Sequence, residues 1–179
     1  MVQKETQAEA HLMLVGPEIA GVADDPESGA VVESVLERWR ALPTELRRRI
    51  HVVLLPTADP TENALMVNAL QHHARVVVQK SLREGFGLTV TEAMWHGRPI
   101  VASRVGGIQD QIDHLVEGVL VDDPHDLDGF ATAFDTLLSD HALAERLGNA
   151  ARARVTQEFL PTRHLLQYAD LIESSLSAA

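Results

Sequence analysis

The sequence predicts an α/β fold, a Rossmann-like parallel sheet with flanking helices and a helical C-terminal tail. Short apolar runs alternate with amphipathic segments, which is the pattern of parallel strands joined by crossover helices. Three of these runs are continuously apolar, as in strands that helices cover on both faces. After Asp122 the pattern becomes wholly helical. The 179 residues are enough for a single domain, residues 1–179.

Five strands are expected, enough for one open sheet. Each is a short run rich in Val, Ile and Leu, bounded by residues that favour turns or begin helices. The expected strands cover residues 11–15, 50–55, 75–79, 99–103 and 118–121.

Crossover helices are expected between these strands, each from a start or stop signal. The first begins at the Asp-Pro pair at 25–26, an acidic cap followed by proline, and ends near Pro43. The second follows Thr61, and the third covers residues 89–96 and stops at Gly97, which tolerates the left-handed conformation of a helix end. The expected apolar faces are Val31, Val32, Val35, Leu36 and Trp39 in the first helix and Leu65, Met66, Ala69 and Leu70 in the second.

Three more helices form the expected tail. They cover residues 127–139, residues 142–159 and residues 163–175. Pro161 separates the last two, because proline cannot continue a helix interior.

The composition limits the classes of partner. The formal charge of -11, from 26 acidic and 15 basic residues, argues against nucleic acid, whose phosphates require clustered Lys and Arg. The longest apolar runs are too short to cross a bilayer, and the N-terminus does not resemble a secretion signal. The expected location is therefore the cytoplasm, with no membrane partner.

Metal binding is not expected. The chain has no cysteine, which excludes disulfides and thiolate sites. His72 and His73 are adjacent on a predicted helix, where they point in different directions, and no third ligand has a matching spacing. Asp122 and Asp123 precede a proline and a predicted helix, so helix capping is the favoured role. We expect neither a metal nor another cofactor.

The segment EGFGLTVTE, residues 84–92, joins a predicted strand to a predicted helix at the carboxyl edge of the sheet, where ligands usually bind. Gly85 and Gly87 let the backbone approach a ligand, and the helix start adds about half a positive charge, which suits a phosphate. Glu84 projects from the loop, and Glu92 lies one turn into the helix. Ionised carboxylates accept hydrogen bonds from neighbouring sugar hydroxyls, so the segment predicts a nucleotide-sugar site.

A plainer interpretation remains open at this point. A glycine-rich turn can serve tight packing alone, and Glu92 can be a solvated helix residue. Helix packing is favoured for Trp95, whereas Phe86 is equally compatible with packing and with stacking on a base or sugar. Lys80 and Arg83 lie near the predicted phosphate position, although a solvated surface role is favoured for both.

The longer stretch REGFGLTVTEAMWHGRPIVASRVGGIQDQI, residues 83–112, resembles the signature of the retaining family 4 glycosyltransferases of the GT-B fold. The motif of that family is an E-x7-E pair around a GFG turn. Within the family, REGFGLTVTEAMW followed by a basic or polar residue, Gly and Pro is similar to members that transfer glucose from a nucleotide donor to free glucose and so form trehalose. The resemblance runs from about Leu12 to Ile172 and implies the C-terminal, donor-binding half of a GT-B fold.

The resemblance also implies a role for each residue of the segment. Glu84 would contact the donor sugar near the reacting centre, and Glu92 would bind the ribose hydroxyls. No protein nucleophile is implied, because the acceptor attacks on the face from which the nucleotide departs. Backbone amides would come from Gly85, Phe86 and Gly87 for the sugar and from Leu88 and Thr89 for the diphosphate.

The chain departs from the family in two respects. An Arg and a Lys in an RFxxxKG-like stretch before the first strand have no counterpart, and neither does an N-terminal acceptor domain. We therefore expect a fragment, excised or natural, that is inactive alone and binds a nucleotide-glucose such as UDP- or ADP-glucose. Two alternatives stay open, namely a relative of the trehalose phosphorylases and a non-catalytic module that binds sugar nucleotides.

Overall fold

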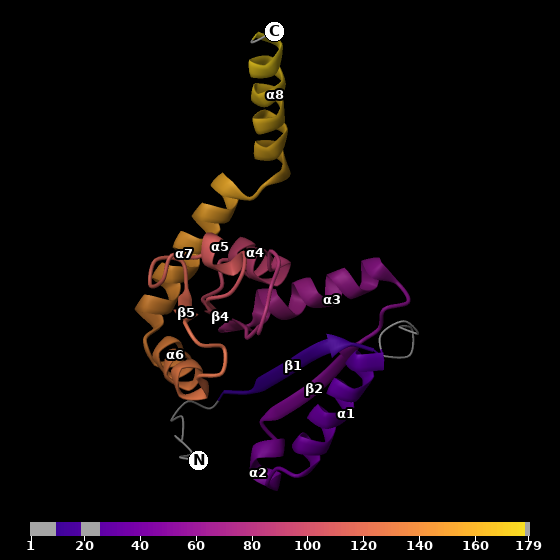
Figure 1. The fold of residues 1–179 in the computed structure, drawn as a ribbon. Coiled ribbons are helices and arrows are strands. Elements are labelled where there is room, and N and C mark those ends of the chain that lie inside the picture. The colour runs from indigo at the N-terminus through magenta and orange to yellow at the C-terminus, as the bar shows by residue number, and fades with distance from the viewer. Residues whose placement is uncertain (1–9, 19–25, 178–179) are drawn as a thin grey trace. The chain divides into compact units, whose positions relative to one another are not determined.

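The computed structural model describes residues 10–18 and 26–177, and the chain forms two compact units (Figure 1). One unit comprises Thr6–Ala69, and the other contains Leu70–Ala179. The division falls within helix α3 (Pro60–His73). The α/β class and the parallel pairing of all five strands confirm the predicted fold class.

The first unit is built on a parallel pair of strands. Strand β1 (Leu12–Pro17) pairs with β2 (Ile50–Leu55), and helices α1 (Pro26–Arg40) and α2 (Thr44–Arg47) connect them. The indole nitrogen of Trp39 donates a hydrogen bond of 2.7 Å to the Ile50 carbonyl, which ties α1 to the start of β2. Of the predicted apolar face of α1, Val31 is exposed, and Val32, Val35, Leu36 and Trp39 are half-buried.

The predicted apolar face of α3 is partly wrong. Leu65 is 66% exposed, and Ala69 is also exposed. The side chains of α3 that are buried or half-buried occur at spacings of three and four residues, as on one face of a helix. They are Asn63, Met66, Val67, Leu70 and Gln71.

The second unit has a three-stranded parallel sheet in the order β3 (Val77–Gln79), β4 (Ile100–Ser103), β5 (Val119–Val121). One face packs against helix α4 (Leu88–Trp95) and the second half of helix α7 (His141–Glu158). The other face packs against helix α6 (Leu127–Ser139) and the first half of α7. Successive residues of β4 therefore enter different cores, Ile100 and Ala102 one and Val101 the other.

The strand positions are confirmed to within two residues, but their pairing is not. The expectation of one open five-stranded sheet is wrong, because β1 and β2 form one sheet and β3, β4 and β5 form another. Apolar periodicity locates strands along the chain, yet it carries no information about which edges pair. Two single-turn helices, α2 and α5 (Ile108–Gln111), were not predicted, because four residues are too few for a 3.6-residue period to show.

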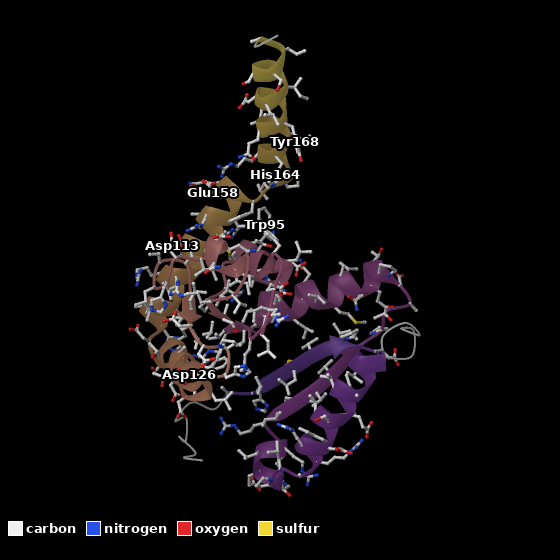
Figure 2. All side chains as sticks on the ribbon, in the orientation of Figure 1. Trp95, Asp113, Asp126, Glu158, His164 and Tyr168 are labelled. Carbon is white, nitrogen blue, oxygen red and sulfur yellow. The ribbon has the colours of Figure 1, made fainter. Side chains whose placement is uncertain are left out.

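All three helices of the expected tail are present. Helix α6 has the predicted bounds, and α6 and α7 supply Phe130, Leu137 and Leu147 to a buried cluster. Helix α8 (Pro161–Ser177) is different, because none of its described residues is buried. Its exposed apolar side chains are Leu165, Leu166, Tyr168, Leu171, Ile172 and Leu176, and Figure 2 labels Tyr168.

Helices α4 and α7 meet at two glycines. Gly97, which follows α4, has φ 64°, so the predicted left-handed helix end is confirmed. A methyl group added to Gly148 of α7 would lie 2.2 Å from the Gly97 carbonyl oxygen. A side chain larger than hydrogen at position 148 would therefore separate the two backbones.

The helices between residues 10 and 177 that the structure describes include none that is both long and apolar enough to span a membrane.

Candidate functional site

The EGFG turn leads directly into α4. Gly87 precedes the first helical residue with φ 91° and ψ 61°, a left-handed conformation that glycine adopts without strain. Its carbonyl oxygen accepts a hydrogen bond of 3.0 Å from the Val90 amide, which closes the first turn. The amides of Leu88 and Thr89 have no acceptor within the helix, because the first N–H groups of any helix lack an intrahelical partner. They are available to an anion.

The carboxylate of Glu84 is hydrogen-bonded to residues of its own turn. The Ser81 hydroxyl donates to Oε2 at 3.2 Å, and the Gly85 amide donates to Oε1 at 3.2 Å. Ser81 is in turn held by the side-chain amide of Gln79, at 2.9 Å. Glu84 is half-buried and receives a donor on each oxygen, so its orientation is set by the residues around it.

Glu92 lies in the second turn of α4 with its side chain exposed. Its Oε2 accepts a hydrogen bond of 3.1 Å from the side-chain amide of Gln71, in the last turn of α3. The structure thus places both predicted carboxylates in the second unit, one before and one within α4. Each has a glutamine in its hydrogen-bond network.

Gly106 and Gly107 support the turn and were missed as site residues. They follow β4 and pass so close to the EGFG backbone that a methyl group on Gly106 would lie 1.7 Å from the Glu84 carbonyl oxygen. The Gly107 amide donates to the Gly85 carbonyl oxygen at 3.0 Å. The signal was present in the sequence as the dipeptide in SRVGGI, since adjacent glycines indicate close backbone approach.

Gln111 holds the same turn from α5. Its side chain is fully buried, and its amide nitrogen donates to the Phe86 carbonyl oxygen. The Phe86 ring remains 45% exposed and packs edge-on against Phe159, with 6.0 Å between the ring centroids. Phe86 therefore combines packing with a surface that a ligand can reach. Trp95, labelled in Figure 2, is 44% exposed at the end of α4.

The cations near the turn are partly engaged. The ammonium group of Lys80 lies 5.7 Å from the centroid of the Phe130 ring. Arg104, after β4, pairs with Asp122. Arg83 is exposed. The start of α4 adds the partial positive charge of a helix terminus, and Lys80 and Arg83 precede the turn in the chain.

The capping role expected of Asp122 and Asp123 is wrong. Asp126 caps α6, accepting a hydrogen bond of 2.9 Å from the Gly129 amide, whereas Asp122 pairs with Arg104. Asp123 accepts from the His125 amide at 2.8 Å, in the loop before the helix. Asp25, the expected cap of the first helix, lies outside the described residues.

Three histidines lie close to one another, two in the last turn of α3 and one just after α4. The ring of His72 lies edge-on to those of His73 and His96, with centroids 5.3 and 5.4 Å away. Burial, followed by the charges of His72 and Arg98, lowers the pKa of His96, while the Glu92 carboxylate opposes this shift. Over the described ranges, no group of three or more His, Cys, Asp and Glu side chains is arranged to hold a metal ion.

The sequence matches the family described as glycosyl transferases group 1 over residues 3–154. Trehalose synthase of Thermococcus litoralis is 37% identical over 172 residues, which are 96% of this chain and 38% of that protein. Trehalose phosphorylase of Pleurotus pulmonarius is 35% identical over 77% of this chain and 18% of its own length. The chain therefore spans about two fifths or less of the curated relatives it matches.

The structure is similar to solved glycosyltransferases. Anabaena Alr3699/HepE in complex with UDP matches with a TM-score of 0.74 and 25% identity over 92% of this chain and 41% of that one. The same protein in complex with UDP-glucose matches with a TM-score of 0.69. These likenesses confirm that the α/β arrangement is that of a GT-B glycosyltransferase domain.

Proposed function

Because the chain belongs to the glycosyl transferases group 1 family, we propose that residues 1–179 are the donor-binding domain of a retaining enzyme. The enzyme would transfer glucose from a nucleotide-glucose to glucose and so form trehalose. The observation that carries the proposal is the EGFG turn, which runs through the left-handed Gly87 into the first turn of α4. A turn of this kind presents backbone amides and a helix dipole to a diphosphate.

The similar proteins supply the ligand class. HepE is described in complex with UDP and with UDP-glucose, and its match to this chain includes the second unit. The likeness to a trehalose synthase over 96% of the chain supports glucose as the transferred sugar and as the acceptor. We propose that a separate N-terminal domain supplies the acceptor site and that neither a metal nor another cofactor is required.

Each residue of the turn has a task in this proposal. The amides of Leu88 and Thr89 bind the diphosphate, and those of Gly85, Phe86 and Gly87 face the sugar, although the Gly85 amide donates to Glu84 in the structure. Glu92 binds the ribose hydroxyls. The Glu84 carboxylate lies beside the glucose ring, where positive charge develops as the bond to the diphosphate breaks, and favours that charge electrostatically.

The likeness to a trehalose phosphorylase favours a second candidate. In a phosphorylase, free phosphate occupies the place that the nucleotide diphosphate takes in a synthase, and the same helix terminus serves both anions. Assays of the intact protein separate the two. Trehalose formation from a nucleotide-glucose and glucose supports the synthase, whereas trehalose breakdown that requires phosphate supports the phosphorylase. A protein that binds nucleotide sugars but catalyses neither reaction is the third, non-catalytic alternative.

We expect the 179-residue chain to bind UDP, ADP or GDP weakly. The diphosphate is held mainly by amides and a helix terminus, and each such charge interaction contributes about 0.3–1 kcal/mol. An affinity nearer millimolar than micromolar follows, or about 4 kcal/mol of binding free energy. Titration followed by NMR measures the affinity and should shift the amide signals of Gly85, Gly87 and Leu88.

Uridine is the matched control ligand for this titration, because it lacks the diphosphate. It should leave the Leu88 and Thr89 signals unchanged. A chain that binds none of the three nucleotides contradicts the proposed donor site. A nanomolar affinity would show that a further cation contributes to the site.

A further inference from the structure

A buried glutamine stands behind Glu92. Gln71 is only 7% exposed, and its amide nitrogen donates to Oε2 of Glu92 at 3.1 Å. Its side-chain oxygen, Oε1, is buried and has no hydrogen-bond partner in the part of the chain that the structure describes. A buried acceptor without a partner destabilises the folded state, because its hydrogen bond to water is lost on folding and not replaced.

Stability alone does not explain a glutamine at this position. A methionine has nearly the same length and volume and would fill the site with no polar group to satisfy. Of the two polar groups of the Gln71 side chain, only the amide nitrogen has a described partner, and that partner is Glu92. Burying the Gln71 amide therefore lowers the stability of the fold, and the one contact that this amide makes is to a carboxylate predicted to bind the ligand.

The contact restricts an otherwise mobile side chain. Glu92 is exposed, and a free glutamate on a helix surface samples several rotamers. A donor fixed in the protein interior selects one orientation of the carboxylate. The glutamine amide is neutral, so it orients Glu92 without cancelling the negative charge, as an arginine or lysine partner would. Oε1 and the second lone pair of Oε2 stay available for hydroxyl donors.

We propose that Gln71 is a positioning residue that fixes the Glu92 carboxylate for the two adjacent hydroxyls of a ribose. The inference rests on the proposed function, in which Glu92 binds ribose. It gives a residue of α3 a role in ligand recognition, in addition to the residues of the EGFG segment. The juxtaposition of Gln71 in the last turn of α3 with Glu92 in the second turn of α4 carries it.

The test compares the ribose preference of four forms of the 179-residue chain. They are the parent, Gln71→Met, Glu92→Gln and the double variant. The preference is the ratio of the dissociation constants for 2′-deoxy-UDP and UDP, measured by NMR titration. We expect Gln71→Met to lower the ratio by roughly 3- to 10-fold, the effect of one well-oriented hydrogen bond, while its affinity for 2′-deoxy-UDP stays unchanged. Its melting temperature should equal or exceed that of the parent chain.

The double variant makes the test specific. Once Glu92 has become a glutamine, the Gln71→Met change should leave the ratio where Glu92→Gln alone puts it, because Gln71 acts through the carboxylate. Equal ratios for the parent and Gln71→Met, with a lowered ratio for Glu92→Gln, would overturn the positioning role and leave the proposed function intact. A chain that binds neither nucleotide would overturn both.

A measurement on the parent chain covers the case in which Gln71→Met does not fold. The side-chain amide signals of Gln71 should move when UDP is added and move less with 2′-deoxy-UDP, because only UDP presents both hydroxyls to the carboxylate. Equal movement with both ligands, or none with either while the backbone signals of Gly87 shift, would overturn the proposal.

Discussion

Replacing Gly106 by alanine is expected to lower the free energy of unfolding by about 3 kcal/mol and to displace the EGFG turn. Gly106 has φ 49°, and the added methyl carbon would lie 1.7 Å from the Glu84 carbonyl oxygen. No side-chain rotation relieves a clash with backbone, so the two loops must separate. The Gly107 to Gly85 hydrogen bond should break with them. Urea unfolding gives the loss of stability, and the Gly85 and Gly87 amide signals report the displacement.

Gly85→Ala is the matched control for this variant. It lies in the same pair of loops, but a methyl group there meets no atom within 4 Å, and its φ is not among the positive values. We expect its effect to stay within about 1 kcal/mol, the range of a glycine replaced at a compatible position. Equal losses in the two variants would show that the close approach of Gly106 to Glu84 does not support the turn.

Replacing Glu84 by glutamine in the intact enzyme is expected to lower kcat by about 100-fold, the typical effect of losing one electrostatic contact to a transition state. In the proposed reaction the glucose ring becomes positive in the transition state, so a negative charge beside it would favour that state more than the ground state. The substitution also changes the local hydrogen bonds. Ser81 and the Gly85 amide each donate to one carboxylate oxygen, and a glutamine amide presents an acceptor to only one of them.

Glu92→Gln is the companion variant, with a different expected signature. In the proposed function Glu92 binds the ribose, which does not change during the reaction, so losing this charged acceptor should raise the donor KM by roughly 10-fold and leave kcat nearly unaltered. Steady-state kinetics on both variants, after thermal melting has shown that each is folded, separates the two roles. Equal effects confined to KM would make Glu84 a hydroxyl ligand only, and unaltered kinetics in both would make EGFGLTVTE a packing motif.

The sequence was informative where local chemistry decides the structure. The strands follow from apolar runs, the end of α4 follows from Gly97, and the bounds of α6 follow from its 3.6-residue period. The position of EGFGLTVTE between a strand and a helix follows in the same way. These features depend on neighbouring residues, so they can be read without knowledge of the fold.

The rest depends on residues far apart in the chain. The pairing of the five strands into two sheets depends on hydrogen bonds between strands that are far apart in the sequence. The contacts of Gly106 with Glu84, and of Gln71 with Glu92, join segments about twenty residues apart. Asp126 caps α6, rather than Asp122 or Asp123, because the capping residue is the one directly before the first helical turn. No spacing rule in a single sequence selects these partners.

The close approach of Gly148 to Gly97 has a consequence for the energetics of binding. It locks the C-terminal end of α4 against α7, and Val90, Ala93 and Met94 are fully buried along the rest of the helix. These contacts oppose a pivoting of the helix and so favour one direction of its first-turn amides and dipole before any anion arrives. Binding of a ligand then costs little conformational entropy of the protein, because the helix is already ordered. A weak affinity for nucleotides would accordingly reflect the small number of positive charges at the site, and not a site that is mobile before the ligand binds.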